Sequence, residues 1–310
     1  MNTNNDTVGF ASIAARLKDL GRRRVALVCP DDSHTAYVVE RALEEGIADF
    51  TLFCGRPLAD WAERLQETCG DHMAVELTAS PDEAARAAVA AVRRGEADLL
   101  MKGTINTDNL LRAVLDKQGG LLEPGAVLTH VALAEMDGLA RLLAFSDAAV
   151  IPNPTIAQFD AIVRHLARMA RLAGADTPHI ALLHCTEKVS EKFPVTLCYE
   201  ELKQRAMRGD YGNAVVDGPM DVKTALDRDS GDIKGISSPV AGCADALVFP
   251  DIEAGNTFYK TISLFKAKMA GVLCGTKAPV VVASRADSGE SKFNSLAVAC
   301  ALAQNSLAQG

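Results

Sequence analysis

The chain has 310 residues, of which 48% are hydrophobic and 23% are charged, enough for one large globular domain or two of about 150 residues. Its formal net charge of -8 argues against a nucleic-acid partner, whose phosphates require a basic face. No apolar run approaches the roughly 18 residues that cross a bilayer, and the N-terminus lacks the basic and apolar segments of a secretion signal. We therefore expect a cytoplasmic protein without a membrane partner. Its 8 cysteines have no C-x-x-C spacing and predict buried thiols, not disulfides or a zinc site.

The first third of the chain alternates predicted helices and strands. Helical spacing or apolar runs predict helices over 10–20, 33–45, 57–67 and 80–94, and strands over 24–29, 49–53 and 97–101. Ser33 is the predicted N-cap of the second helix, and S-P-D-E at 80–83 forms a capping box with proline at the first helical position. The strand over 97–101 runs into K-G-T-I-N-T, and another helix follows.

The rest of the chain continues the alternation after one predicted antiparallel pair, strands over 127–133 and 142–151. A break at P-N-P, residues 152–154, predicts a domain boundary. Further elements are predicted as a helix over 155–173 with a T-x-x-Q cap, a strand over 179–184, a helix over 194–208, strands over 214–217, 246–249 and 279–283, and helices from 257 and from about 288.

Four of the predicted strands end in loops rich in glycine, hydroxyl and charged residues. These loops are K-G-T-I-N-T at 102–107, D-G-P at 217–219, P-D-I-E-A-G-N at 250–256 and S-R-A-D-S at 284–288. The carboxyl ends of strands in an open α/β sheet are the usual place for a ligand. Glycine allows close backbone approach, and helix N-termini favour an oxyanion such as phosphate. Lys102, Arg112 and Arg285 would supply the positive charge.

At these loops the sequence resembles the phosphate acetyltransferase and phosphate butyryltransferase family. The resemblance rests on S-P-V-A-G at 238–242, F-P-D-I-E-A-G-N at 249–256, the Tyr259-Lys260 pair and the Ser284-Arg285 pair, and it covers roughly residues 97–302. M-K-G at 101–103, T-H-V at 129–131 and S-R-A-D-S are more similar to the butyryl branch than to the acetyl branch.

The resemblance implies reversible transfer of a short acyl group, in which acyl-CoA and phosphate give acyl phosphate and CoA. It implies two α/β domains with a cleft between them, of the isocitrate/isopropylmalate-dehydrogenase-like kind, and a homodimer or higher homo-oligomer. Carried onto this chain, the first domain is 1–148 plus 279–310 and the second is 149–278. CoA and phosphate are substrates, and neither a metal nor a permanently bound cofactor is expected.

The resemblance and the chemistry together assign the candidate site residues. Arg285, Arg112 and Thr104 are predicted to bind phosphate, because guanidinium groups make paired hydrogen bonds to phosphate oxygens. Ser284 is predicted to donate a hydrogen bond to the phosphate or the developing oxyanion. The residues predicted to bind CoA are Lys102, Gly103 and Asn256.

The general base for the CoA thiol is the point where the chain departs from the family. The acetyltransferases have an aspartate seven residues after the serine, where this chain has Ser291. Asp287 and Glu290 are the substitutes that we expect nearby.

Structural roles compete with several of these functional ones. Asn256 fits an N-cap for a helix beginning at residue 257, Asp251 and Glu253 fit a cap or an ion pair, Asp217 fits a turn, and His130 fits a core histidine.

Three rival functions remain. One is a phosphate acetyltransferase, and another is a non-catalytic protein that binds CoA esters or phosphate. The third is a dehydrogenase of similar fold that uses a nucleotide and a metal, for which Asp245, Asp251 and Glu253 are too dispersed.

Overall fold

The computed structural model describes residues 9–284 and 287–307, and the chain divides into two compact units. Unit 1 contains Thr129–Lys268, and unit 2 contains Phe10–Leu128 together with the chain from Met269 onward. Both are mixed α/β structures, as the sequence predicted. The domain limits derived from the resemblance stay a prediction.

Unit 2 is built around a mostly parallel sheet in the order β3-β2-β1-β4-β11-β10. Only β10 runs antiparallel to its neighbour β11 among the pairs in this part of the sheet. Its strands are β1 (Arg23–Val28), β2 (Ala48–Cys54), β3 (Met73–Leu77), β4 (Leu99–Lys102), β10 (Lys268–Cys274) and β11 (Val280–Val281). Its helices are α1 (Phe10–Lys18), α2 (Ser33–Glu44), α3 (Asp60–Thr68), α4 (Pro81–Arg93), α5 (Thr107–Val114) and α11 (Gly289–Leu307).

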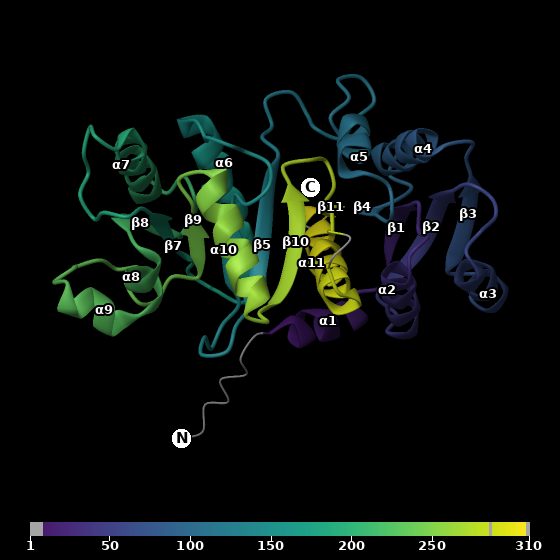
Figure 1. Ribbon diagram of the computed structural model, residues 1–310, viewed down its shortest axis with the longest axis horizontal. Helices are drawn as coiled ribbons and strands as arrows, with labels where there is room; N and C mark the ends of the chain where they lie inside the picture. Colours follow the sequence, from purple (N-terminus) through teal and green to yellow (C-terminus); the bar gives the residue numbers. More distant parts are fainter. Residues whose placement is uncertain (1–8, 285–286, 308–310) are drawn as a thin grey trace. The chain divides into compact units, whose positions relative to one another are not determined.

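Helices cover both faces of the unit 2 sheet, with α4 and α5 on one side and α1, α2 and α11 on the other (Figure 1). The central strands are therefore mostly apolar, and β1 and β4 bury four consecutive residues each, Lys102 at the end of β4 included. β11 lies beside β4 although most of the chain separates them in sequence.

Unit 1 has a sheet in the order β5-β6-β9-β7-β8, in which β5 is antiparallel to β6 and the other pairs are parallel. The antiparallel pair was predicted from the sequence and is confirmed. Its strands are β5 (Thr129–Glu135), β6 (Leu143–Ser146), β7 (His179–Leu183), β8 (Val215–Met220) and β9 (Ala246–Val248). Its helices are α6 (Ile156–Leu172), α7 (Pro194–Met207), α8 (Val222–Leu226), α9 (Arg228–Ile233) and α10 (Ile252–Leu264).

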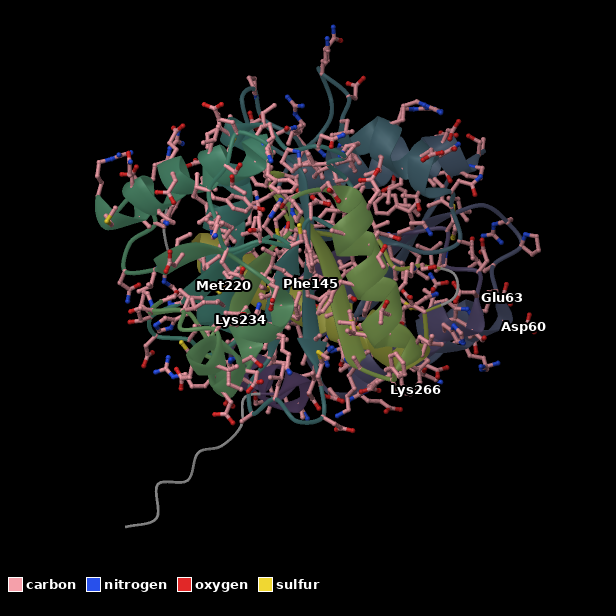
Figure 2. The ribbon with its side chains drawn as sticks, turned by 60° about the vertical axis from the view of Figure 1, so that its left-hand side comes forward. Asp60, Glu63, Phe145, Met220, Lys234 and Lys266 are labelled. Atoms are coloured by element: carbon pink, nitrogen blue, oxygen red, sulfur yellow. The ribbon has the colours of Figure 1, made fainter. Side chains whose placement is uncertain are left out.

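The core of unit 1 contains an aromatic cluster around Phe145 of β6. Phe145 is fully buried (Figure 2), and its ring packs edge-on against Phe258 at 5.2 Å and against Phe249 at 6.1 Å between centroids. Burial of one such ring contributes about 2 kcal/mol, and edge-to-face contacts add to it. The cluster fixes α10 on the sheet.

The helix caps confirm some predictions and correct two. Thr155 and Gln158 form the predicted capping box at the start of α6, and Ser80 caps α4 as predicted. The predicted caps Ser33 and Asn256 are wrong, because Asp32 caps α2 and Asp251 caps α10, each by accepting a backbone hydrogen bond three residues ahead. No helix in the described ranges has the length and apolar content that a membrane span requires.

Candidate active site

The loops that carry most of the predicted site residues meet at one edge of the unit 2 sheet. In the strand register Val28 lies opposite Lys102, and Val281 lies opposite Met101. The parallel strands β1, β4 and β11 therefore end side by side, and their following loops begin at the same edge. We call this region, formed by residues 29–33, 102–106 and 282–288 without the undescribed 285 and 286, the carboxyl edge of unit 2.

Helices α2, α5 and α11 begin directly after these three loops. Each helix presents its first backbone N–H groups and the positive end of its dipole at its N-terminus. This arrangement favours an anionic ligand at the carboxyl edge.

The loops after β1 and β4 are tightly joined through the carbonyl group of Cys29. Cys29 has a positive φ of 50°, and the Asp31 N–H donates to its oxygen at 3.1 Å, so the chain turns sharply around Pro30. The Thr104 N–H donates to the same oxygen at 2.7 Å. Thr104 Oγ1 lies 3.0 Å from that oxygen and 3.0 Å from Asp31 Oδ2. Residue 103 must be glycine, because a Cβ there would lie 2.1 Å from the Cys29 oxygen.

The Cys29 thiol is not suited to act as a nucleophile. Burial raises its pKa to about 11, and the negative charge of Asp31 adds to the shift. The thiol therefore stays protonated near neutral pH, and the reactive thiolate is scarce.

A second aspartate after β1 connects the edge to α11. Asp32 Oδ1 accepts a hydrogen bond of 3.0 Å from Lys292 Nζ, and Asp32 also accepts bonds from the backbone and hydroxyl of Thr35. Desolvation acts to raise the pKa of Asp32, but the bonds from Thr35 and Lys292 outweigh it and lower the pKa. Asp32 is thus held ionised by this network.

The loop after β11 contains the predicted catalytic residues. The Ser284 N–H donates to Asp287 Oδ2 at 2.7 Å, and the Asp287 N–H donates back to the Ser284 carbonyl at 3.1 Å. Ser284 is exposed, and Arg285 lies outside the described residues. Glu290 accepts bonds from Arg41 at 2.6 Å and from the Tyr37 hydroxyl at 3.0 Å, so it belongs to the packing between α2 and α11.

Lys102, the last residue of β4, is only 3% exposed. Its Nζ donates to the carbonyl of the next residue, Gly103, at 3.1 Å. The sequence placed Lys102 among the CoA ligands, and in the structure its ammonium group lies within the carboxyl edge and not on the surface.

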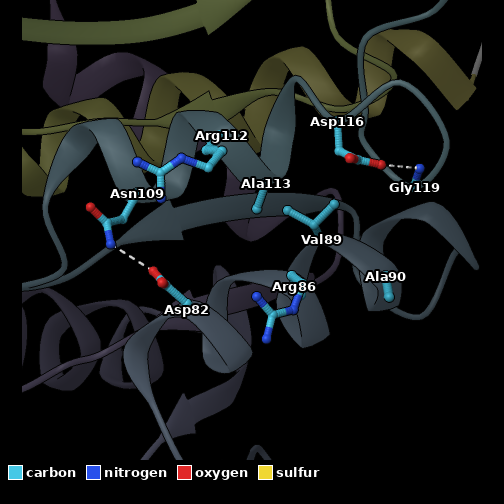
Figure 3. A pocket seen from close by; sticks show the side chains of 9 residues that line it. All are labelled: Asp82, Arg86, Val89, Ala90, Asn109, Arg112, Ala113, Asp116 and Gly119. Carbon is cyan, nitrogen blue, oxygen red and sulfur yellow. Dashed lines mark hydrogen bonds between the residues drawn. The ribbon is translucent and has the colours of Figure 1, made fainter.

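Arg112 lies on α5 and lines a cavity of about 390 Å³ between α4 and α5 (Figure 3). Arg86 of α4 lines the same cavity, and apolar side chains such as Val89 and Ala113 contribute to the wall. Neither arginine forms an ion pair with another described residue.

The two carboxylates that line this cavity already have partners. Asp82 accepts a bond of 2.6 Å from Asn109, and Asp116 accepts from the backbone N–H groups of Gln118 and Gly119. Those backbone bonds, from Gly119 first, lower the pKa of Asp116. The two guanidinium groups of the cavity are thus available to an anion.

The predicted loop of unit 1, residues 250–256, is largely used to hold its own structure. Asp251 caps α10, and Asn256 Nδ2 donates to the Ala148 carbonyl at 2.9 Å. At Gly255 a Cβ would lie 2.1 Å from the Asp147 carbonyl oxygen, so α10 packs directly on the backbone after β6. Asp217 similarly accepts a bond from the N–H of the next residue, within β8.

The structure adds four residues that the sequence interpretation did not name: Asp31, Asp32, Lys292 and Arg86. The two aspartates follow Pro30 at the end of the predicted strand over 24–29. The expectation that ligands bind at the carboxyl ends of strands, which was applied to the other strands, would therefore have found them. Lys292 and Arg86 stand inside helical patterns and give no local signal.

In the described ranges no three histidine, cysteine, aspartate or glutamate side chains gather in a way that could hold a metal ion.

Comparisons with known proteins match most of the chain. The model of the family described as Phosphate acetyl/butaryl transferase matches residues 55–300. The chain is 36% identical to the phosphate acetyltransferase of Thermotoga maritima over 283 residues, which are 91% of this chain and 95% of that protein. It is also 36% identical to the phosphate butyryltransferase of Clostridium acetobutylicum over 300 residues, 96% of this chain and 98% of that protein.

A solved structure agrees with these sequence matches. The crystal structure of a branched-chain phosphotransacylase from Enterococcus faecalis superimposes with a TM-score of 0.78 at 31% identity, covering 91% of this chain and 99% of that one.

Proposed function

Since the chain belongs to the phosphate acetyl/butyryl transferase family, we propose that it is a phosphate acyltransferase that converts short-chain acyl-CoA and phosphate into acyl phosphate and CoA, with butyryl as the preferred group. The observation that carries this proposal is the meeting of Thr104, Ser284 and the N-termini of α2, α5 and α11 at the carboxyl edge of unit 2. Such an edge suits the phosphate anion, which accepts the acyl group in this reaction.

Inorganic phosphate is proposed to bind at this edge. Ser284 carries a hydroxyl group that would donate to it, and Arg285 would supply the bidentate guanidinium contact. Thr104 borders this position, but its own hydroxyl already serves the Cys29 carbonyl and Asp31. The reaction requires the acyl carbonyl group to lie between a phosphate oxygen and the CoA sulfur. The loops after β11 and β4 begin at neighbouring strand ends, and we propose that this position lies beside them.

The cavity between α4 and α5 is proposed to receive the phosphorylated nucleotide of CoA. Its two unpaired guanidinium groups, Arg86 and Arg112, attract phosphate, and its apolar wall suits the flat base. The sequence assigned Arg112 to inorganic phosphate. We propose the larger ligand for it instead, because Arg112 shares a cavity with a second arginine. Lys102 ends β4, and Gly103 begins the loop that leads to α5, the helix that carries Arg112. Their contacts with CoA stay predictions from the resemblance.

The preference for butyryl rests on the similarity of residues 101–103, 129–131 and 284–288 to the butyryl branch, since relatives of both names are equally similar over the whole chain. The role of Asn256 in CoA binding, a homodimer and a cytoplasmic location are retained as predictions from the resemblance.

The proposed function is tested by phosphate-dependent release of CoA from acetyl-, propionyl-, butyryl- and isobutyryl-CoA, in the presence of a chelator and without nicotinamide. We expect release with every acyl group and the highest kcat/KM with butyryl-CoA. The highest kcat/KM with acetyl-CoA would make the protein an acetyltransferase. No release with any acyl group would contradict the proposal and favour a protein that binds CoA esters without catalysis.

A further inference from the structure

We propose that Asp31 is the general base that takes the proton of the CoA thiol, an inference that rests on the proposed function. In the direction of thioester synthesis the thiol proton passes to a carboxylate oxygen of Asp31. The sulfur then attacks the carbonyl carbon of the acyl phosphate, and the bond from this carbon to the phosphate oxygen breaks. The phosphate leaves with the electron pair and takes up the proton from Asp31, so that the base is regenerated.

The carboxylates around the carboxyl edge differ in how many hydrogen bonds and ion pairs they already form. Asp32 is held by Lys292 and Thr35, and Asp287 accepts the Ser284 N–H. Glu290 is held by Arg41 and Tyr37. Asp31 is exposed, and in the described part of the chain its carboxylate bonds only to the hydroxyl of Thr104.

The turn after β1 holds Asp31 in a fixed place. Its N–H donates to the Cys29 carbonyl at 3.1 Å, and the Thr104 N–H donates to the same oxygen at 2.7 Å. The left-handed backbone of Cys29, at φ 50°, is uncommon for a residue with a side chain and is stabilised here by these bonds. A base that is fixed in this way loses little entropy when it meets its substrate.

The hydrogen bonds of Thr104 suit both protonation states of Asp31. Thr104 Oγ1 lies 3.0 Å from Asp31 Oδ2 and 3.0 Å from the Cys29 carbonyl oxygen, but a hydroxyl has only one proton to donate. When Asp31 is ionised, Thr104 donates to it. When Asp31 has taken a proton, Asp31 can donate to Thr104 Oγ1 while the hydroxyl turns to Cys29. Both states are hydrogen-bonded, as a group that cycles between them requires.

The neighbouring thiols of Cys29 and Cys54 do not compete with Asp31 for the proton of CoA. Burial raises the pKa of the thiols of Cys29 and Cys54, in both cases with a contribution from the charge of Asp31, so neither competes for the proton near neutral pH. Of the other charged groups at this edge, Asp32 and Lys292 form a pair that is neutral as a whole, and Lys102 is a cation whose Nζ donates to the Gly103 carbonyl.

The test compares the wild-type protein with Asp31→Asn in the formation of thioester from butyryl phosphate and CoA. The rates are measured from about pH 6 to about pH 9, a range that includes the pKa of a free thiol, about 8.5. We expect Asp31→Asn to lower kcat/KM for CoA about 100-fold near pH 7. The remaining rate should rise about tenfold per pH unit below the pKa of the thiol and level off above it, because it depends on thiolate formed in solution. Glu67→Gln removes an exposed carboxylate of the same unit and should match the wild type.

A second variant separates catalysis from folding. Asp31→Ala should lose activity and regain part of it when acetate is added, since a free carboxylate can take the place of the missing one, whereas a purely structural role gives no rescue. Asp31 is excluded as the base if Asp31→Asn keeps the wild-type rate, or if its loss is the same at every pH. Failure of the proposed function has a different signature, because the wild-type protein itself would then form no thioester.

Discussion

Lys292 donates a hydrogen bond of 3.0 Å to Asp32, and this ion pair joins α11 to the N-cap of α2. The Lys292 side chain is only 5% exposed, so its charge is taken out of water and depends on Asp32 for compensation. The loops after β1 and β11 are the two that precede these helices. The pair therefore connects two of the three loops of the carboxyl edge.

Lys292→Met is expected to destabilise the protein by about 2 kcal/mol, less than for a fully buried pair because Asp32 is partly exposed and keeps its bonds from Thr35. Urea unfolding at neutral pH measures the loss. The exposed residue Lys117 provides the control, since Lys117→Met should stay near the wild type. Adding Asp32→Asn to Lys292→Met should restore part of the stability, and a further loss instead would contradict the ion-pair interpretation.

Gly103→Ala is expected to disturb the carboxyl edge without a change of charge. The added Cβ would lie 2.1 Å from the Cys29 carbonyl oxygen, so the loops after β1 and β4 must separate. Such overpacking costs about 2 kcal/mol, and we expect it to reduce the acyltransferase rate as well because Thr104 moves with the loop. Gly55→Ala is the matched control, where a Cβ meets its nearest atom at an ordinary 3.6 Å. Equal activity and stability in the two variants would show that the loop after β4 accommodates the added Cβ without cost.

The sequence predicted the strand ends of the site but not the contacts between them. Thr104 and Ser284 were found because each follows an apolar run that stops at a loop. Asp31 was missed although it stands just after a predicted strand, because the strand-end rule was not applied there, and its partner lies 73 positions away. Lys292 stands inside a helical pattern, and its partner lies 260 positions away. Their contacts arise from the placement of β1 and β11 on either side of β4, which a local pattern does not contain.

The start of α10 shows a different limit of sequence interpretation. Asp251 and Asn256 are both residue types that cap helices, and the glycine between them suggested a loop. The helix begins at Ile252 because Asp251 accepts the Ala254 N–H, and the glycine is instead a point of close contact with the Asp147 carbonyl. A motif that carries the family resemblance thus has a structural explanation.

The stability of unit 1 is expected to depend on His165 of α6 in mildly acidic solution. Burial lowers its pKa from 6.5 to about 4, with a further contribution from the charge of Arg168, and its Nδ1 shares a bond of 2.8 Å with the Thr129 hydroxyl. Between these two values the unfolded chain binds a proton that the folded chain does not, so stability falls as the pH decreases from 6.5 to about 4.

The loss amounts to about 3 kcal/mol over this range. Urea unfolding at a series of pH values should show the wild type losing stability relative to His165→Gln, which has no such proton to bind. Curves that stay parallel over the whole range would mean that His165 does not titrate differently in the folded state.

The two arginines of the cavity between α4 and α5 allow the proposed CoA site to be separated from the phosphate site. Arg86→Ala and Arg112→Ala are each expected to raise the KM for acyl-CoA about fivefold, as for loss of one partly exposed charged contact, and to leave the KM for phosphate unchanged. The effect should shrink at high salt. Butyryl-pantetheine, which lacks the nucleotide, should react equally well with the variants and the wild type. Arg64→Ala, at an exposed position of α3, is the charge-matched control. A rise in the KM for phosphate in Arg112→Ala alone would instead support the role that the sequence gave to Arg112, and would move the nucleotide of CoA out of this cavity.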